Sequence, residues 1–232
     1  MEIYQFTEIG PRTENQDSFG IKNQNNILIA CVADGVGGAN NGKFASQLSV
    51  DKFLESVHSY EDNLALIIES IHNTVLDYQE KDSNYKGMAT TFTACLISKN
   101  KLKGIHLGDS RLCVLRRNGI KQLTQNHTEA KRLYKAGKLS FEEMNNYPRK
   151  NVIESAIGMK DKILIQPFYF DLEPKDRIII TSDGIHELIS KIEFRDLSIK
   201  NKNLNIFGDE LASLVKSKKM IDNSTFVIIE IT

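Results

Sequence analysis

Short apolar runs recur along the chain and predict strands. Each run is rich in Ile, Leu, Val, Phe and Thr, and each is bounded by Gly, Asn or Asp. The runs in the middle of the chain follow one another without intervening helices, so we expect largely antiparallel sheets. The Asn-Gly pair in "RRNG" (Arg116–Gly119) predicts a hairpin turn. The predicted strands are Asp17–Lys22, Ile27–Ala33, Thr90–Ser98, Leu102–Leu107, Arg111–Arg116, Ile163–Asp171, Arg177–Thr181 and Ser224–Ile231.

Helical periodicity is clearest near the two ends of the chain. Lys43–Val57 and Asn63–Tyr78 carry apolar residues every three to four positions, which predicts two helices. A third helix is expected from Asn205 to Ser217, and a short one after Gly184. The stretch Thr128–Ile157 is polar, with helical segments and Pro148, and we interpret it as an excursion from the core. The pattern predicts two packed sheets flanked by helices.

Composition narrows the class of protein. The length of 232 residues suits one large domain, so we expect residues 1–232 to form a single unit. Lys plus Arg total 30 and Asp plus Glu total 30, and this zero net charge argues against nucleic acid or an anionic membrane as partner. The chain starts without a signal-peptide pattern, and its apolar runs are shorter than the ~20 residues of a membrane span.

The three cysteines indicate the compartment in which the protein resides. Cys31, Cys95 and Cys113 are widely spaced, each within an apolar run, and none has the spacing of a zinc site or a disulfide framework. We interpret them as buried thiols in a reducing compartment. We therefore expect a cytoplasmic protein.

Four aspartates follow or precede apolar strands beside glycine or another turn residue: Asp34, Asp109, Asp183 and Asp222. Taken singly, each is more typical of a turn or a helix N-cap than of a functional site. Strand ends gathered at one edge of a sheet pair would bring the carboxylates together, and like charges then require cations. Mg²⁺ or Mn²⁺ suits such oxygen ligands, and no histidine pair has the spacing of a zinc site.

These segments, in this order, resemble the type 2C (PPM) family of metal-dependent Ser/Thr protein phosphatases. The stretch Thr128–Ile157 is similar to the flap of the bacterial branch of that family. Seven motifs in the family's order cover the chain almost end to end, which makes the resemblance specific. They are Arg12–Ser18 "RTENQDS", Val32–Gly38 "VADGVGG", Gly87–Thr91 "GMATT", Gly108–Arg111 "GDSR", Leu123–Thr128 "LTQNHT", Thr181–Ile185 "TSDGI" and Asp222–Thr225 "DNST".

The resemblance implies an α+β fold, an αββα sandwich of two antiparallel sheets with helices outside and metal ions in a cleft at one edge. It implies that Asp34 bridges two tightly bound Mn²⁺ or Mg²⁺ ions, that the Gly35 carbonyl ligates one ion, and that Asp183 and Asp222 complete the other site. The expected nucleophile is a water or hydroxide between the ions, which attacks phosphorus directly. Arg12 resembles the family's phosphate-binding arginine, although an isolated arginine is more often a surface cation.

Two further aspartates have weaker assignments. Asp17 resembles an acid that orients metal-bound water, and we group it with the metal residues. Asp109 resembles a ligand of a third, weaker ion that it would share with Asp183. The residues alone leave open that Asp109 caps a turn.

The sequence departs from the family's usual pattern at three positions. Gln16 replaces a common Glu, Val36 replaces the His found in many animal and plant members, and Asn126 replaces the usual Asp. The proton donor to the leaving group is therefore unassigned, with metal-bound water as our interpretation. His127 and His186 are more typical of packed or surface histidines than of proton donors.

The leading hypothesis is a protein-serine/threonine phosphatase, a monomer acting on phosphorylated proteins and opposing a cognate Ser/Thr kinase. One alternative is a catalytically silent module of the same fold that binds phosphopeptides or a partner. Another is a metal-dependent nuclease, but "GVGG" lacks the Lys-Ser/Thr of a phosphate-binding loop.

Overall fold

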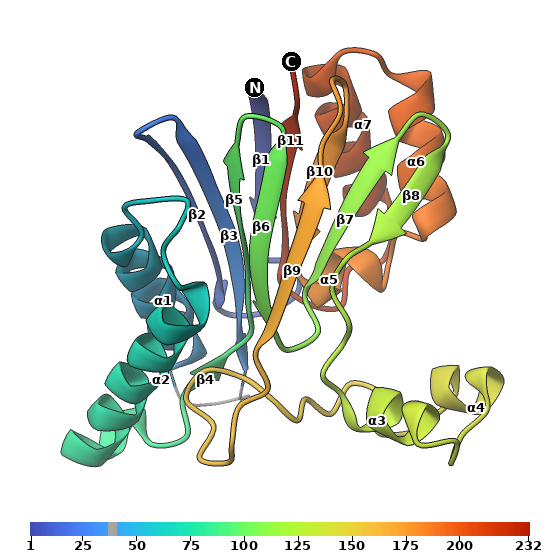
Figure 1. Cartoon of the computed structure of the whole chain (residues 1–232). Coiled ribbons are helices and arrows are strands. Elements are labelled where there is room, and N and C mark those ends of the chain that lie inside the picture. The colour runs from blue at the N-terminus through green and yellow to red at the C-terminus, as the bar shows by residue number, and fades with distance from the viewer. Residues whose placement is uncertain (37–40) are drawn as a thin grey trace.

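Two sheets pack face to face, and helices cover both outer faces, as Figure 1 shows for this computed structural model. The structure describes residues 1–36 and 41–232, so the last two glycines of the motif Val32–Gly38 lie outside the described part. All strand pairs in the described part of the chain are antiparallel, as the sequence predicts. The predicted αββα sandwich is confirmed.

The order of strands brings the two ends of the chain together. The first sheet runs β1 (Glu2–Glu8), β11 (Ser224–Glu230), β10 (Arg177–Thr181), β7 (Arg111–Arg116) and β8 (Gly119–Gln122). The second sheet runs β2 (Asp17–Gln24), β3 (Ile27–Val36), β5 (Phe92–Ser98), β6 (Lys101–Leu107) and β9 (Gln166–Asp171), with β4 (Ala89–Thr90) paired to β3.

Helices form the outer layers and the connections. The second sheet is covered by α1 (Gly42–Ser56) and α2 (Leu64–Lys81), which a short 3₁₀ turn (Ser83–Tyr85) follows. The first sheet is covered by α6 (Lys191–Lys200) and α7 (Leu204–Ser217), and the short α5 (Asp183–His186) follows β10 directly. The flap contains α3 (Glu129–Lys135) and α4 (Phe141–Asn145), and it projects from one end of the sandwich (Figure 1).

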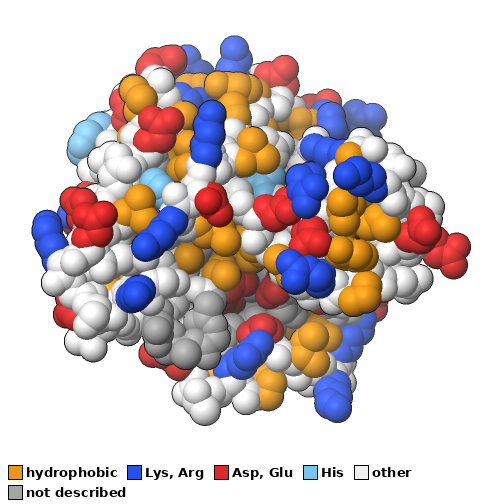
Figure 2. Space-filling model, turned by 90° about the horizontal axis from the view of Figure 1, so that it is seen from below, with side chains coloured by type: hydrophobic (Ala, Val, Ile, Leu, Met, Phe, Trp, Pro, Cys, Tyr) orange, Lys and Arg blue, Asp and Glu red, His pale blue; other side chains and the backbone are white. Residues whose placement is uncertain are grey.

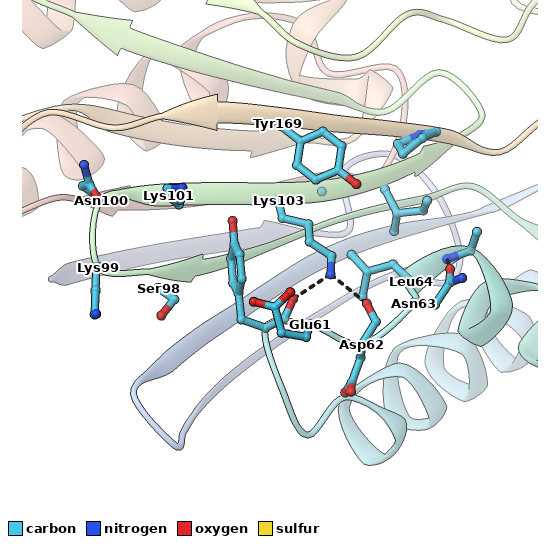
Figure 3. A pocket seen from close by; sticks show the side chains of 15 residues that line it. Glu61, Asp62, Asn63, Leu64, Ser98, Lys99, Asn100, Lys101, Lys103 and Tyr169 are labelled. Carbon is cyan, nitrogen blue, oxygen red and sulfur yellow. Dashed lines mark hydrogen bonds between the residues drawn. The ribbon is translucent and has the colours of Figure 1, made fainter.

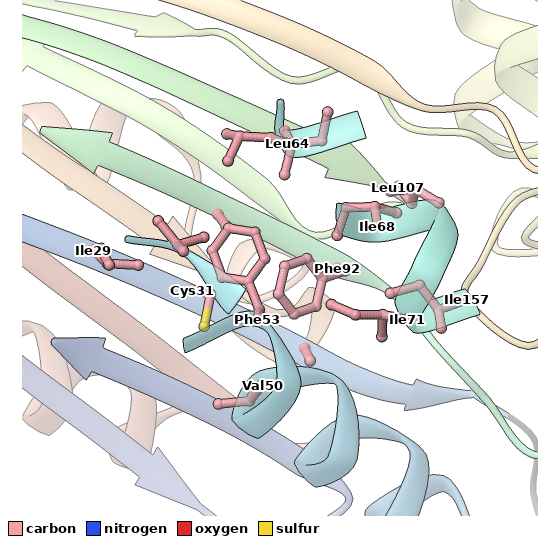
Figure 4. Packing of buried hydrophobic residues seen from close by; sticks show 14 of the residues in the cluster. Ile29, Cys31, Val50, Phe53, Leu64, Ile68, Ile71, Phe92, Leu107 and Ile157 are labelled. Carbon is pink, nitrogen blue, oxygen red and sulfur yellow. The ribbon is translucent and has the colours of Figure 1, made fainter. Parts of the chain in front are cut away.

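The hydrophobic core has three layers, which explains why β3 reads as a continuous apolar run. Ile29 and Cys31 face α1 and α2, whereas Leu28 and Val32 face the other sheet, so both faces of this strand are buried. Figure 4 shows the layer under α1 and α2, where Phe53 and other large side chains interlock. Each such side chain contributes about 1.5–3 kcal/mol by burial.

The remaining layers complete the sandwich. Val227 and Ile180 belong to the layer between the two sheets. Phe207 of α7 and Phe226 of β11 pack in the third layer, between the first sheet and its helices. The three cysteines are buried and free, as the sequence predicts.

Most predicted elements are confirmed, and the differences have local causes. Thr90–Ser98 divides into β4 and β5 at Thr91, whose N–H donates to the Asp34 carbonyl at 2.8 Å. The strand expected from Ile163 begins only at Gln166. β1 escaped prediction because it is a half-exposed edge strand, and α6 because only Phe194 of it is buried.

The flap buries little and is held by polar contacts. Only Ala130 is buried in α3, and no residue of α4 is buried. A bridge joins Thr128 to Ile153, and Ser140 starts α4 with a reciprocal capping box. Among the described residues, no helix is long and apolar enough to cross a membrane.

Candidate metal centre

Five aspartates meet at one end of the sandwich, which we call the carboxylate edge: Asp17, Asp34, Asp109, Asp183 and Asp222. Asp17 begins β2 directly opposite Asp34 of β3 in the antiparallel register. Asp183 follows β10, and Asp222 precedes β11, the antiparallel neighbour of β10, so both lie at the same end of the first sheet. Asp109 lies in the connection from β6 to β7, which crosses from one sheet to the other.

A cleft of about 390 Å³ opens there, and its walls include Asp34, Asp183 and Asp222 together with Arg12 and Gly35. Figure 2 looks onto this end of the molecule, where acidic side chains lie in a hollow near the centre. The residues that line this cleft therefore include five of those that the sequence analysis predicts to hold metal or phosphate, whereas Asp17 and Asp109 are buried and do not line it.

The crowded carboxylates repel one another. Burial, and then the charges of Asp17, Asp183 and Asp109, raise the pKa of Asp34 well above its usual value. Burial, with Asp222 as the main charged neighbour, raises the pKa of Asp183. Burial raises the pKa of both Asp17 and Asp109 to about 7, and in each case Asp183 adds to the effect. Ionising this cluster without a cation is unfavourable.

Two carboxylate oxygens at this edge have no partner. Asp17 Oδ1 and Asp109 Oδ1 are the buried side-chain oxygens, in the described part of the chain, that accept no hydrogen bond. The other oxygen of Asp17 accepts from the Ser182 hydroxyl at 2.8 Å. A buried unpaired carboxylate oxygen costs several kcal/mol unless a cation or water satisfies it. Oxygen donors without partners and with raised pKa values fit hard divalent cations such as Mn²⁺ or Mg²⁺.

Arg12 partly neutralises the cluster in this structure. Its Nε donates to Asp222 Oδ1 at 2.9 Å and its terminal nitrogen to Oδ2 at 2.6 Å, a bidentate pair. Among residues 1–36 and 41–232, no group of three or more His, Cys, Asp or Glu side chains is arranged to hold a metal ion. In this structure the guanidinium engages Asp222 as a cation would.

Two glycines let backbone segments approach closely at the edge. A Cβ atom on Gly184 would lie 1.9 Å from the Asn223 carbonyl oxygen, so only glycine allows α5 to lie against the start of β11. A Cβ atom on Gly35 would lie 2.5 Å from the backbone of Gly42 at the start of α1. Gly35 donates its N–H to the Gln16 carbonyl at 3.2 Å.

Asn223 holds the segment that carries Arg12, a role that the sequence analysis missed. Its side-chain N–H groups donate to the carbonyls of Ile9 at 2.8 Å and Glu14 at 2.9 Å, and its Oδ1 accepts from the Gln16 N–H at 2.9 Å. Asn223 is buried and directly follows Asp222. The signal was present in the motif "DNST", because a buried amide beside a ligand needs several polar partners.

Hydroxyl groups join the motifs behind the carboxylates. Ser182 donates to Asp17, and its hydroxyl also accepts from the Thr225 N–H at 2.9 Å, which ties β10 to β11. Thr91 and Ser110 share a hydrogen bond of 2.8 Å between their hydroxyls, which fixes the β6–β7 connection next to β4.

The histidines near the edge are packed rather than reactive. His127 is buried and its Nδ1 accepts from the Gly108 N–H at 3.3 Å, and His186 is buried against the Thr181 hydroxyl at 3.1 Å. Burial lowers the pKa of His127 to about 4 and that of His186 well below its usual value. Neither imidazole is charged at neutral pH.

A larger cleft, about 890 Å³, lies away from the carboxylates between the α1–α2 connection and the strands β6 and β9. Figure 3 shows Lys103 reaching across it to the backbone at Asp62, to which its ammonium donates at 2.7 Å. The lining of this cleft includes Glu61 and Asp62 but none of the five aspartates of the carboxylate edge.

The family model for protein phosphatase 2C matches residues 8–220. The chain belongs to the protein phosphatase 2C family. A curated relative, protein phosphatase PhpP of Streptococcus pneumoniae, is 32% identical over 99% of this chain and 97% of its own length. Serine/threonine phosphatase stp of Listeria welshimeri is 29% identical over 94% of this chain and 91% of its own length.

Solved structures of bacterial phosphatases agree with this 2C-family assignment. The serine/threonine phosphatase of S. agalactiae superposes with a TM-score of 0.91 at 27% identity and covers 100% of this chain and 99% of its own. Stp1 from Staphylococcus aureus gives a TM-score of 0.92 at 28% identity, with 100% and 95% covered. The resemblance to the bacterial branch is therefore confirmed, and no match favours a catalytically silent module.

Proposed function

We propose that this member of the 2C family is a metal-dependent phosphatase that hydrolyses phosphoserine and phosphothreonine in proteins. The observation that carries the proposal is the carboxylate edge, where strand ends from both sheets place five aspartates together and leave two buried oxygens without partners. The names of the relatives support phosphoserine and phosphothreonine as substrates.

The residues divide into ligands and positioning groups. Asp34 would bridge two ions, the Gly35 carbonyl would complete the first site, and Asp183 and Asp222 would complete the second. When bound, two Mn²⁺ or Mg²⁺ ions supply the activation of water and neutralise phosphoryl charge. Asp17, held by Ser182, would orient water at the edge.

Arg12 is proposed to bind the phosphoryl group of the substrate. The bidentate geometry that it shows on Asp222 is the geometry with which a guanidinium holds two phosphate oxygens. The Arg12 side chain is 54% exposed, so it is accessible to a ligand that enters the cleft. The Asn223 clamp holds the segment from Ile9 to Gln16 and thereby sets the position of Arg12.

Asp109 is proposed as the ligand of a third, weaker ion that it shares with Asp183. Its buried Oδ1 has no partner, which argues against a turn-capping role for that oxygen. Two carboxylates leave most of a coordination shell to water, so the ion would bind loosely.

We further propose that residues 1–232 act as one catalytic domain with the flap at residues 128–157. The opposing enzyme would be a cognate Ser/Thr kinase, because a kinase must form the phosphoester that the phosphatase hydrolyses. Free buried cysteines support a reducing, cytoplasmic compartment. The protein is proposed to be a monomer.

The test is phosphate release from p-nitrophenyl phosphate, a phosphothreonine peptide and DNA, with and without Mn²⁺. We expect Mn²⁺-dependent release from the first two substrates and none from DNA. Release from DNA alone would favour a nuclease, and binding of the phosphopeptide without release would favour the silent module. Asp77→Asn, an exposed aspartate on α2, is the matched control for changes at the edge.

A further inference from the structure

A second cleft of about 710 Å³, the flap cleft, lies between the flap and the first sheet. Its floor is formed by β7, β8 and the segment that joins α5 to α6, and its roof by α3 and α4. The charged side chains that line it are four basic residues and one acidic residue, although the whole chain has no net charge. They are Arg111, Lys131, Lys150, Lys191 and Glu187.

Arg111 has no carboxylate partner. Its Nε donates only a long hydrogen bond of 3.4 Å to the amide oxygen of Asn126, and no acidic side chain in the described ranges pairs with it. A half-buried guanidinium beside a neutral amide has spare donors that face the cleft.

The lysines add unneutralised charge. Burial lowers the pKa of Lys131, and the neighbouring charges of Lys135, Lys191 and Arg111 contribute, so these cations lie close enough to repel. Lys131 lies over the Tyr134 ring, and no carboxylate of the described residues pairs with Lys191.

Glu187 does not offset this charge. It is the acidic side chain of the cleft, and Lys150 binds it at 3.2 Å. Lys and Arg side chains are visible over the flap on the right of Figure 2. Basic side chains therefore outnumber acidic ones in the lining of the flap cleft.

The flap cleft is one helical turn from the carboxylate edge. Asp183 at the start of α5 lines the catalytic cleft, whereas His186 and Glu187 at its end line the flap cleft. One turn spans about 5 Å, and an extended peptide advances about 3.3 Å per residue. This spacing corresponds to about two residues of extended chain, so a peptide with its phosphorylated residue at the carboxylate edge would bring a side chain two or more residues away into the flap cleft.

We propose that the flap cleft binds a second anionic group of the substrate, two to four residues from the phosphorylated Ser or Thr. The Arg111 fork and the ammonium groups of Lys131 and Lys191 would hold it by charge-assisted hydrogen bonds. The group is a carboxylate of Asp or Glu or a second phosphoryl group, which present the same acceptor oxygens. This subsite rests on the proposed phosphatase function, and it defines the substrate class as acidic or multiply phosphorylated segments.

The test compares three phosphothreonine peptides that differ at positions two to four residues from the phosphothreonine. One carries Asp there, one carries phosphoserine, and one carries Asn. The wild type should have a KM roughly tenfold lower for at least one anionic peptide than for the Asn peptide, the factor of one charge-assisted hydrogen bond. The two anionic peptides identify the source, and an equal KM for all three overturns the proposal.

Two variants locate the effect. Asn126→Asp places a carboxylate beside Arg111 and should remove most of the preference while the arginine and the fold are retained. Lys191→Gln should reduce the preference about threefold. Lys52→Gln on α1, at the other side of the molecule, is the matched control and should keep the full ratio (Figure 1). A preference that survives Asn126→Asp and Lys191→Gln places the subsite elsewhere and overturns the assignment.

A binding measurement separates the two proposals. Fluorescence anisotropy of labelled peptides, at low salt and without divalent cation, reports the flap cleft without turnover. If no substrate is hydrolysed in Mn²⁺, the phosphatase function is wrong. The flap cleft is still supported if wild-type protein, and not Asn126→Asp, binds the Asp or phosphoserine peptide more tightly. Equal binding of all three peptides contradicts it.

Discussion

The carboxylate edge and the flap cleft are neighbours, but they carry side chains of opposite charge on supports of different rigidity. At the edge, anionic side chains are buried on strand ends, fixed by Asn223, Ser182 and closely packed glycine backbone. In the flap cleft, two of the four cationic side chains extend from the flap, which has almost no core of its own, and the other two come from β7 and the start of α6. The comparison suggests a division of labour in which the rigid edge performs chemistry and the weakly anchored flap selects substrates.

The two regions also differ in the interactions that stabilise them. At the edge, the buried carboxylates repel one another. Strand pairing in both sheets nevertheless holds them in place. The flap is held by exposed ion pairs such as Arg149–Glu129 and Arg132–Glu154, which contribute at most about 1 kcal/mol each. Changes at the edge should therefore affect catalysis strongly, and changes in the flap should affect substrate preference mildly.

The largest effect is expected from the proposed bridging carboxylate. Asp34→Asn removes charge from both proposed metal sites, so turnover of p-nitrophenyl phosphate at saturating Mn²⁺ should fall at least roughly 100-fold. The melting temperature should not decrease, because a neutral amide relieves repulsion with Asp17 and Asp183. Wild-type turnover in Asp34→Asn, with Asp77→Asn as control, would show that Asp34 is not a bridging ligand.

Asp109→Ala should have the next largest effect. Turnover should fall roughly tenfold, and a millimolar phase of metal activation should disappear while the tight phase remains. The measurement is a Mn²⁺ titration of activity together with metal content after dialysis. A titration that matches the wild type in every phase would mean that no third site exists at this residue.

Arg12→Ala should act on substrate binding. KM for a phosphopeptide should rise roughly tenfold, because the lost contacts are to phosphoryl oxygens, and the affinity for Mn²⁺ should change less. Steady-state kinetics and isothermal titration with Mn²⁺ measure the two quantities separately. A large change in Mn²⁺ affinity at unaltered KM would instead show that Arg12 acts mainly through its pairing with the carboxylate of Asp222.

The flap should give smaller and more selective effects. Glu129→Gln weakens its bonds to Arg149 and Tyr147, so kcat/KM for phosphopeptide should fall about threefold, more than that for p-nitrophenyl phosphate. Glu80→Gln, an exposed glutamate on α2, is the control. Equal losses on both substrates would remove the distinction between the flap and the edge.

The smallest effect is a pH dependence of stability without metal. Burial raises the pKa of Asp17 and Asp109 to about 7, above the value near 4 of the unfolded chain. Their protonated forms are favoured by folding, so this stability is present below about pH 4 and is lost as pH rises through 7. The melting temperature in EDTA should be roughly 5 °C higher at pH 5 than at pH 8. Adding Mn²⁺ at pH 8 should reverse the loss, and a flat profile would contradict it.

How far the sequence predicted the structure depends on the scale of the feature. Fully buried strands such as β3 and β10 were predicted closely because apolar runs between turn residues leave little choice. β1 was missed because an edge strand with alternating exposure lacks that signal. Its place is set by pairing with β11, more than 200 residues away, which no local window contains.

The candidate site shows the same limit. The order of the motifs predicts Asp34, Asp183 and Asp222 as residues of one metal site, and the three line one cleft. The pairing of Arg12 with Asp222 could not be predicted, because it depends on how Asn223 folds the segment before β2. The cationic flap cleft could not be predicted from the sequence either, because the residues that line it are scattered between β7, α3 and the start of α6. Of its members, only Asn126 stood out in the sequence, as a departure from the family's usual Asp, and no consequence was assigned to it.

The pairing of β1 with β11 also has a consequence for the time course of folding. Glu2 pairs with Glu230 and Glu8 with Ser224, so during synthesis β1 must wait for β11 before the two strands can pair. At about 5–20 residues per second, that wait is roughly 10–40 s, with an edge of β10 also unpaired. Because Arg12 follows β1 and Asp222 precedes β11, the nascent chain should be inactive until β11 emerges, and folding should be slow for a domain of this size.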